Sequence, residues 1–136
     1  MTKQQDFSMW SANFILFCLA NFLYYGAFYL YIPVLPQYVE MLGGTPADIG
    51  LVGGAFGLSS FIIRPYLGKL ANEWGRKRMM LLGTISFALL FLLFGRVTGV
   101  VALVVLRLAH GVCLAMYLAA SAAYIADYAP VDRRGE

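Results

Sequence analysis

Four long apolar stretches constrain this chain more than any other feature. Of its 136 residues, 61% are hydrophobic and only 12% are charged, whereas soluble domains are roughly half apolar and about a quarter charged. A helix needs about 20 apolar residues to cross a bilayer. We therefore predict an all-α membrane protein with four transmembrane helices, at about residues 13–35, 46–67, 79–94 and 100–128.

Prolines and capping residues set the predicted ends of the first two helices. Pro33 and Pro36 are expected to stop the first helix, because proline lacks an N–H donor. A loop should then continue as far as Thr45. Thr45 and Asp48 have capping-box spacing, and Pro46 suits the first helical position. The second helix is therefore predicted to begin at Pro46.

Small residues crowd the second predicted helix. Gly50 and Gly54, together with Gly53 and Gly57, form two overlapping GxxxG pairs. In lipid such pairs let another helix approach closely, so we expect a helix contact on this face. The third predicted helix is almost uniformly apolar and is expected to face lipid over much of its surface.

Basic residues gather at one end of the predicted helices. Four crossings return the chain to its starting side, which therefore carries Lys3, the 68–78 loop, Arg133 and Arg134. The loops on the opposite side contain one basic residue, Arg96. The positive-inside rule predicts a multi-pass plasma-membrane protein with the N-terminus and the 68–78 loop in the cytoplasm. The charge follows topology and forms no basic face, so no nucleic-acid partner is expected.

The gap between the second and third predicted helices carries a motif. Its sequence, GKLANEWGRK at residues 68–77, resembles the G-x-L-a-D-r-x-G-r-[RK] signature of the major facilitator superfamily, between the same two helices. PVLP at 33–36 resembles the end of helix 1 in proton-coupled drug exporters. RLAHG at 107–111 resembles the helix 4 motif, and 127–135 resembles the start of the loop between helices 4 and 5. The four features occur in order along the whole chain.

This resemblance implies two six-helix bundles built from inverted repeats, of which the chain would supply about a third. It implies secondary active transport of a small molecule by alternating access, with efflux of drugs or metabolites coupled to protons. The implied partners are the substrate, protons, membrane lipid and the remaining helices of the same transporter. An importer of sugars or organic acids is one alternative. A non-transporting truncated fragment or membrane assembly subunit is another.

Arg107 is the most informative side chain in the predicted fourth helix. A charge at the membrane centre costs about 2.5–3.5 kcal/mol on insertion scales, so it is kept where it faces a cavity or a partner. The alternative is that the long side chain extends to the outer membrane interface. The resemblance makes Arg107 the motif arginine and places His110 at the motif's glutamine position, beside Gly111. His110 is interpreted as a hydrogen-bonding substitute for that glutamine, with proton carriage as the alternative.

Two residues of the first helix are further candidates for the cavity wall. Asn21 and Tyr25 are four residues apart and share a helix face. An amide within the membrane needs a polar partner, and the resemblance implies that helices 1 and 4 line the central cavity. The alternative for Tyr25 is a packing or interfacial role.

The motif segment is expected to act as a conformational switch. In the family, the motif aspartate joins a charge network that latches the two bundles in the outward-open state. This sequence has the uncharged Asn72 at that position, followed by Glu73. The resemblance assigns the switch to Gly68, Asn72, Glu73, Gly75, Arg76 and Lys77.

Nothing in the sequence predicts an enzyme. We find no metal-ligand cluster, nucleophile–base pair or phosphate-binding loop, so no cofactor is expected. Cys18 and Cys113 both lie in apolar segments and are predicted to be small core residues.

Overall fold

A computed structural model describes residues 12–128, and it is helical along almost all of this range. Four helical segments are long and apolar enough to cross a membrane, and no strand occurs between residues 12 and 128. The predicted all-α membrane fold is thus confirmed. Lys3, Arg133, Arg134 and most of the 127–135 segment lie outside the described residues. The elements are α1 (Ala12–Tyr31), η1 (Ile32–Val34), α2 (Leu35–Met41), α3 (Pro46–Trp74), α4 (Arg76–Leu93), η2 (Phe94–Arg96) and α5 (Val100–Tyr128).

The two prolines after α1 do not stop the chain from being helical. A single 3-10 turn, η1, follows Tyr31, and α2 then continues to Met41 where a loop was expected. Both prolines lie at the first or second position of a new helical segment, where the missing N–H has no intrahelical partner to lose. The prediction of a helix end at Pro36 was therefore wrong. The capping box at the start of α3 is present, and Thr45 N–H donates to the Asp48 carboxylate at 2.7 Å.

The expected loop over residues 68–78 is also mostly helical. α3 continues through Gly68 to Trp74 and α4 starts at Arg76, so Gly75 is the only non-helical residue between them. The charged residues of the motif, lysine, glutamate and arginine, are good helix formers, and polarity alone does not end a helix. What ends α3 is the backbone of Gly75, with φ 88° and ψ 134°. This conformation is open to glycine and strained for other residues.

We expect Gly75→Ala to lower the free energy of unfolding by about 1–3 kcal/mol, because the alanine Cβ would be forced into a sparsely populated backbone region. Thermal unfolding in detergent measures the effect. Gly68→Ala is the matched control, because Gly68 is helical and a Cβ there meets nothing within 4 Å. Equal destabilisation by both variants would contradict this account of the Gly75 turn.

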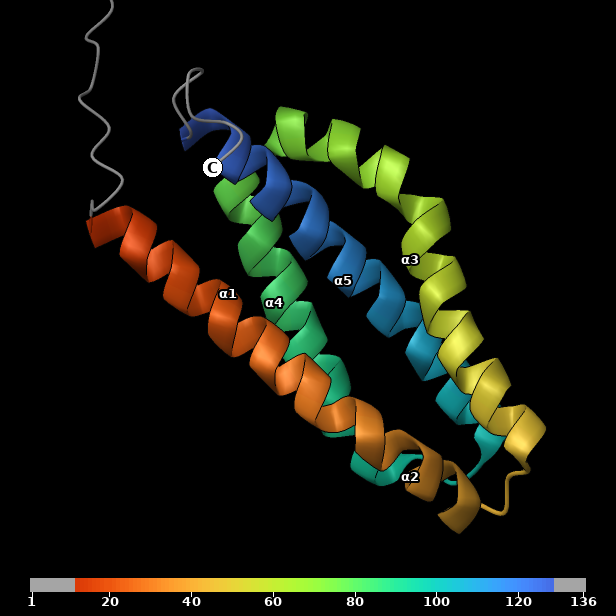
Figure 1. Ribbon diagram of the computed structural model, residues 1–136. Coiled ribbons are helices and arrows are strands. Elements are labelled where there is room, and N and C mark those ends of the chain that lie inside the picture. The colour runs from red at the N-terminus through yellow and green to blue at the C-terminus, as the bar shows by residue number, and fades with distance from the viewer. Residues whose placement is uncertain (1–11, 129–136) are drawn as a thin grey trace, which may run out of the picture.

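α5 lies at the centre of the described helices, between α3 and α4 (Figure 1). Gly83 of α4 is close to α5, and a Cβ built at Gly83 would be 3.1 Å from the Cys113 carbonyl oxygen. The start of α1, the α3–α4 junction and the end of α5 all lie at one end of the bundle (Figure 1). The basic residues Lys69, Arg76, Lys77 and Arg78 belong to that junction, while Arg96 lies at the opposite end.

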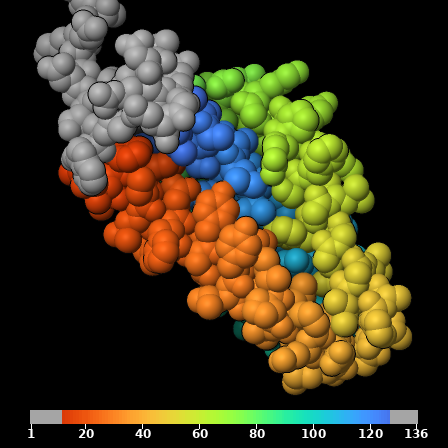
Figure 2. All heavy atoms as spheres, viewed as in Figure 1, coloured from red at the N-terminus to blue at the C-terminus, as the bar shows by residue number. Residues whose placement is uncertain are grey.

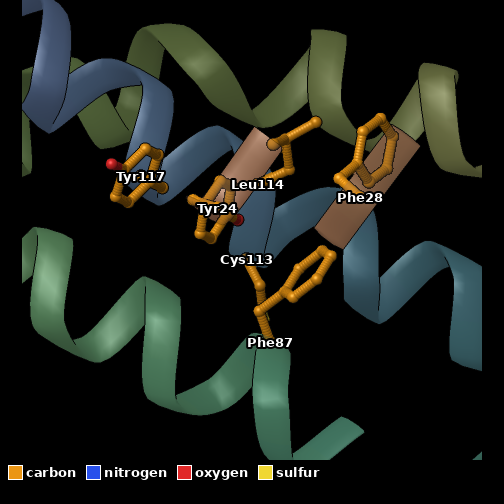
Figure 3. Packing of buried hydrophobic residues seen from close by; sticks show 6 residues of the cluster. All are labelled: Tyr24, Phe28, Phe87, Cys113, Leu114 and Tyr117. Carbon is orange, nitrogen blue, oxygen red and sulfur yellow. The ribbon is translucent and has the colours of Figure 1, made fainter. Parts of the chain in front are cut away.

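Aromatic side chains hold α1 against the other helices. Tyr24 stacks on Tyr117 of α5 with ring centroids 3.9 Å apart, and it also meets Phe87 of α4 at 5.2 Å. Phe28, one turn further along α1, stacks on Phe56 of α3 at 5.3 Å. Figure 3 shows side chains from α1, α4 and α5 converging in this cluster, which also contains Cys113 and Leu114. Both cysteines are free thiols; Cys113 is buried as predicted, whereas Cys18 is exposed among the described residues, so its predicted core position was wrong.

α3 approaches α5 closely at Gly111. A Cβ built there would collide with the Phe56 carbonyl oxygen and the Ser59 hydroxyl of α3. By contrast, a Cβ at any glycine of the two GxxxG pairs meets nothing within 4 Å. Within residues 12–128, the expected helix contact therefore does not form on the GxxxG face, and α3 meets α5 through its other side.

Candidate functional site

The Arg107 side chain is buried in the helix bundle, only 4% exposed. Its Nε donates to the Val52 carbonyl oxygen of α3 at 3.4 Å. Its guanidinium carbon lies 4.2 Å from the centre of the Phe56 ring and 5.7 Å from that of Tyr31. Both are cation–π distances, within the ~6 Å limit for such contacts. The arginine is thus held between α1 and α3 and does not extend to an interface.

The His110 side chain faces a different helix. It is 1% exposed, and its Nε2 lies 3.2 Å from the Phe87 carbonyl oxygen of α4. The Nε2–H tautomer donates this hydrogen bond, while Nδ1 is buried with no partner among the described residues. The imidazole stacks on Phe94 with ring centroids 5.1 Å apart. This placement favours the hydrogen-bonding role over that of a proton carrier.

Arg107 and His110 are only three residues apart, yet they hydrogen-bond to different helices, α3 and α4. Gly111, one turn after Arg107, lies on the same side as the arginine and contacts α3. α5 lies between α3 and α4 (Figure 1). Two side chains of α5 that point in somewhat different directions can therefore contact different helices. The structure therefore brings Arg107 and Gly111 together against α3. His110 faces α4 but stays linked to the arginine through aromatic rings, because Phe94 contacts both the His110 imidazole and Tyr31.

Asn21 and Tyr25 lie on α1, both partly buried. The Asn21 amide donates to the Phe17 carbonyl oxygen of its own helix at 2.9 Å, so this donor needs no partner across a cavity. Tyr25 makes an edge contact with Tyr117 of α5 at 6.3 Å. Figure 2 shows α1 and α3 as two ridges, with atoms of α5 visible between them.

The residues of the α3–α4 junction lie at one end of the bundle, and in the sequence they come well before Arg107. Asn72, Glu73, Gly75 and Lys77 are exposed, and Gly68 and Arg76 are partly exposed. Asn72 and Glu73 are consecutive on the last turns of α3, so their side chains point about 100° apart. The carboxylate of Glu73 therefore does not stand in for a charge at position 72.

The sequence did not identify the residues that surround Arg107. Val52 contributes a backbone carbonyl, and Phe56 and Tyr31 contribute ring faces. Phe56 follows Val52 by four residues and so lies on the same face of α3, but no motif marks either residue. Within residues 12–128, no group of three or more possible metal ligands occurs.

A buried arginine among membrane-length helices is typical of a polytopic membrane protein with a functional interior. Comparison with known families makes the class specific: residues 17–136 match the Major Facilitator Superfamily. The chain belongs to this family, which confirms the resemblance found in the motifs.

Two relatives show where in the family the chain is most similar. It is 33% identical over 107 residues to Multidrug resistance protein 2 of Bacillus subtilis (strain 168), covering 79% of this chain and 27% of that protein. It is 35% identical over 107 residues to Quinolone resistance protein NorA of Staphylococcus aureus (strain Mu50 / ATCC 700699), covering 79% of this chain and 28% of that protein. The chain thus spans little more than a quarter of the length of either relative.

Proposed function

We propose that this chain is part of a secondary active transporter that exports drugs or metabolites across the cell membrane by alternating access. The observation that carries this proposal is its identity of 33–35% to two resistance proteins over 79% of its length. Family membership supports a transport protein rather than an enzyme. The remaining helices of the transporter would supply the other wall of the cavity.

The proposed cavity lies beside α1 and α5. Arg107 supplies a positive charge that forms no ion pair with a described carboxylate, and Tyr25 supplies an aromatic surface. Such a lining suits amphipathic or aromatic solutes. Asn21, Gly111 and His110 act as supports in this proposal: Gly111 lets α3 approach the arginine, and His110 fixes α5 to α4.

Transport in membrane vesicles that contain the full-length protein tests the proposal. We expect extrusion of a cationic dye or an antibiotic that depends on a proton gradient. Vesicles with the Arg107→Gln variant serve as the control for leakage. Uptake of a sugar or an organic acid without any dye extrusion would overturn the efflux proposal.

Uptake of organic acids is a second candidate, and one observation favours it. The buried guanidinium of Arg107 has only one hydrogen bond among the described residues, from Nε, so its terminal nitrogens remain available to a substrate carboxylate. An arginine binds a carboxylate through two parallel hydrogen bonds.

We further propose that the α3–α4 junction is cytoplasmic and acts as the conformational switch. The basic residues Lys69, Arg76, Lys77 and Arg78 at this end support the orientation through the positive-inside rule. Labelling of single cysteines from either side of the membrane tests it. Reaction of a cysteine at position 72 from the outside would contradict the orientation.

Asn72→Asp is expected to restore the charge of the family motif and to shift the protein toward its outward-open state. The accessibility of a cysteine at Tyr29, an exposed position on α1, should then rise from the outside and fall from the inside. The measurement uses a background without Cys18 and Cys113. Glu73→Gln changes the charge at the neighbouring position and should leave accessibility unchanged. An unaltered ratio in Asn72→Asp would speak against the latch.

A further inference from the structure

The guanidinium of Arg107 is held without a carboxylate. Among the residues that the structure describes, its contacts are the Val52 carbonyl oxygen at 3.4 Å and the ring faces of Phe56 and Tyr31 at 4.2 and 5.7 Å. A long side chain with one weak hydrogen bond has many rotamers available. Some other group must therefore select the conformation in which Arg107 is buried.

The geometry points to Phe56 as the positioning residue for Arg107. Phe56 lies one turn after Val52, so one face of α3 offers both the carbonyl oxygen and the negative face of a ring. Gly111 contributes to the same contact, because its missing side chain lets the Phe56 backbone approach α5. Phe56 is in turn stacked on Phe28 of α1 at 5.3 Å, which restrains the orientation of its ring.

This role has a chemical consequence that simple packing does not. A cation–π contact depends on the negative face of an aromatic ring, so tyrosine or tryptophan retains it and an aliphatic side chain of similar size does not. If Phe56 merely fills space, leucine or methionine should replace it almost as well as tyrosine. If it positions Arg107, only aromatic residues should preserve the arginine's environment.

The direct test is spectroscopic and requires no transport. In the purified full-length protein labelled with ¹⁵Nε-arginine, the Nε–H signal of Arg107 is assigned by its disappearance in Arg107→Lys. A proton above a ring face is shifted upfield, so this signal should move downfield in Phe56→Leu and Phe56→Met and stay near its original position in Phe56→Tyr. The two aliphatic variants guard against the failure of one of them to fold.

Phe61→Leu is the matched control, because Phe61 is an exposed aromatic residue of the same helix, α3, and its removal leaves the ring over Arg107 in place. An Arg107 signal that does not move in Phe56→Leu and Phe56→Met would overturn the inference. So would a shift in Phe56→Tyr as large as that in Phe56→Leu.

The transport consequence rests on the proposed function. Phe56→Leu should lower extrusion roughly fivefold, whereas Phe56→Tyr should leave it close to the original rate. Phe56→Leu should add no further loss to Arg107→Gln, because glutamine has no charge to place over the ring and both changes remove one interaction. A signal that shifts as expected in variants with unchanged transport would uphold the positioning of Arg107 and contradict its proposed role in transport. Independent, additive losses in the double variant would contradict the positioning itself.

Discussion

Gly111→Ala is expected to destabilise the packing of α3 on α5 by about 1–3 kcal/mol, the typical cost of inserting a methyl group into a packed interior. Two of the three atoms that the new Cβ would meet are the Phe56 carbonyl oxygen and the Ser60 backbone nitrogen. Backbone atoms in a helix cannot rotate away as a side chain can, so the two helices must separate. The separation should also lengthen the contact between Arg107 and α3.

Thermal unfolding of the 136-residue chain in detergent measures this effect, and Gly54→Ala is its matched control. Gly54 lies within a helix, and a Cβ there meets nothing within 4 Å. Alanine should be neutral or slightly stabilising at that position, because glycine within a helix costs about 0.5–1 kcal/mol relative to alanine. A larger loss in Gly54→Ala than in Gly111→Ala would show that the assigned packing of α3 is wrong.

Arg107→Gln is expected to reduce transport on the order of a hundredfold, because it removes the positive charge of the proposed site, and a hydrogen bond to a charged group contributes about 1.5–3 kcal/mol. Arg107→Lys separates the two candidate functions. In an exporter that uses the positive charge of Arg107, lysine should retain part of the activity. In an importer that binds a carboxylate through two parallel hydrogen bonds, lysine should fail almost as completely as glutamine.

Initial rates of extrusion and uptake in vesicles provide the measurement for both variants. Arg96→Gln is the control for a change of net charge, because Arg96 is exposed and lies at the end of η2, outside the proposed site. It should transport at close to the original rate. Wild-type rates in Arg107→Gln would remove Arg107 from the proposed site.

The apolar lengths and the family motifs predicted the class of fold well, but the helix ends were less predictable. The capping box at Thr45 and Asp48 is local, since both residues lie at the first turn of the helix that they cap. The effect of Pro33 and Pro36 on the helix ends, by contrast, depends on residues beyond the neighbouring turn. Whether a proline ends a helix or starts the next one depends on the path of the following segment, and here Tyr38 of α2 donates a hydrogen bond to the Phe94 carbonyl oxygen of η2.

The sequence by itself determined that this chain forms four membrane-length helices and that a charged residue, Arg107, lies within the last of them. Both follow from hydrophobicity and helical rise, which need no knowledge of neighbours. Only the tertiary structure decided that Arg107 meets α3, that His110 meets α4, and that Gly111 marks the close contact in place of the GxxxG pairs. An apolar helix surface gains little free energy when it moves from contact with lipid to contact with another helix. Close packing and polar contacts therefore determine which helix each face contacts.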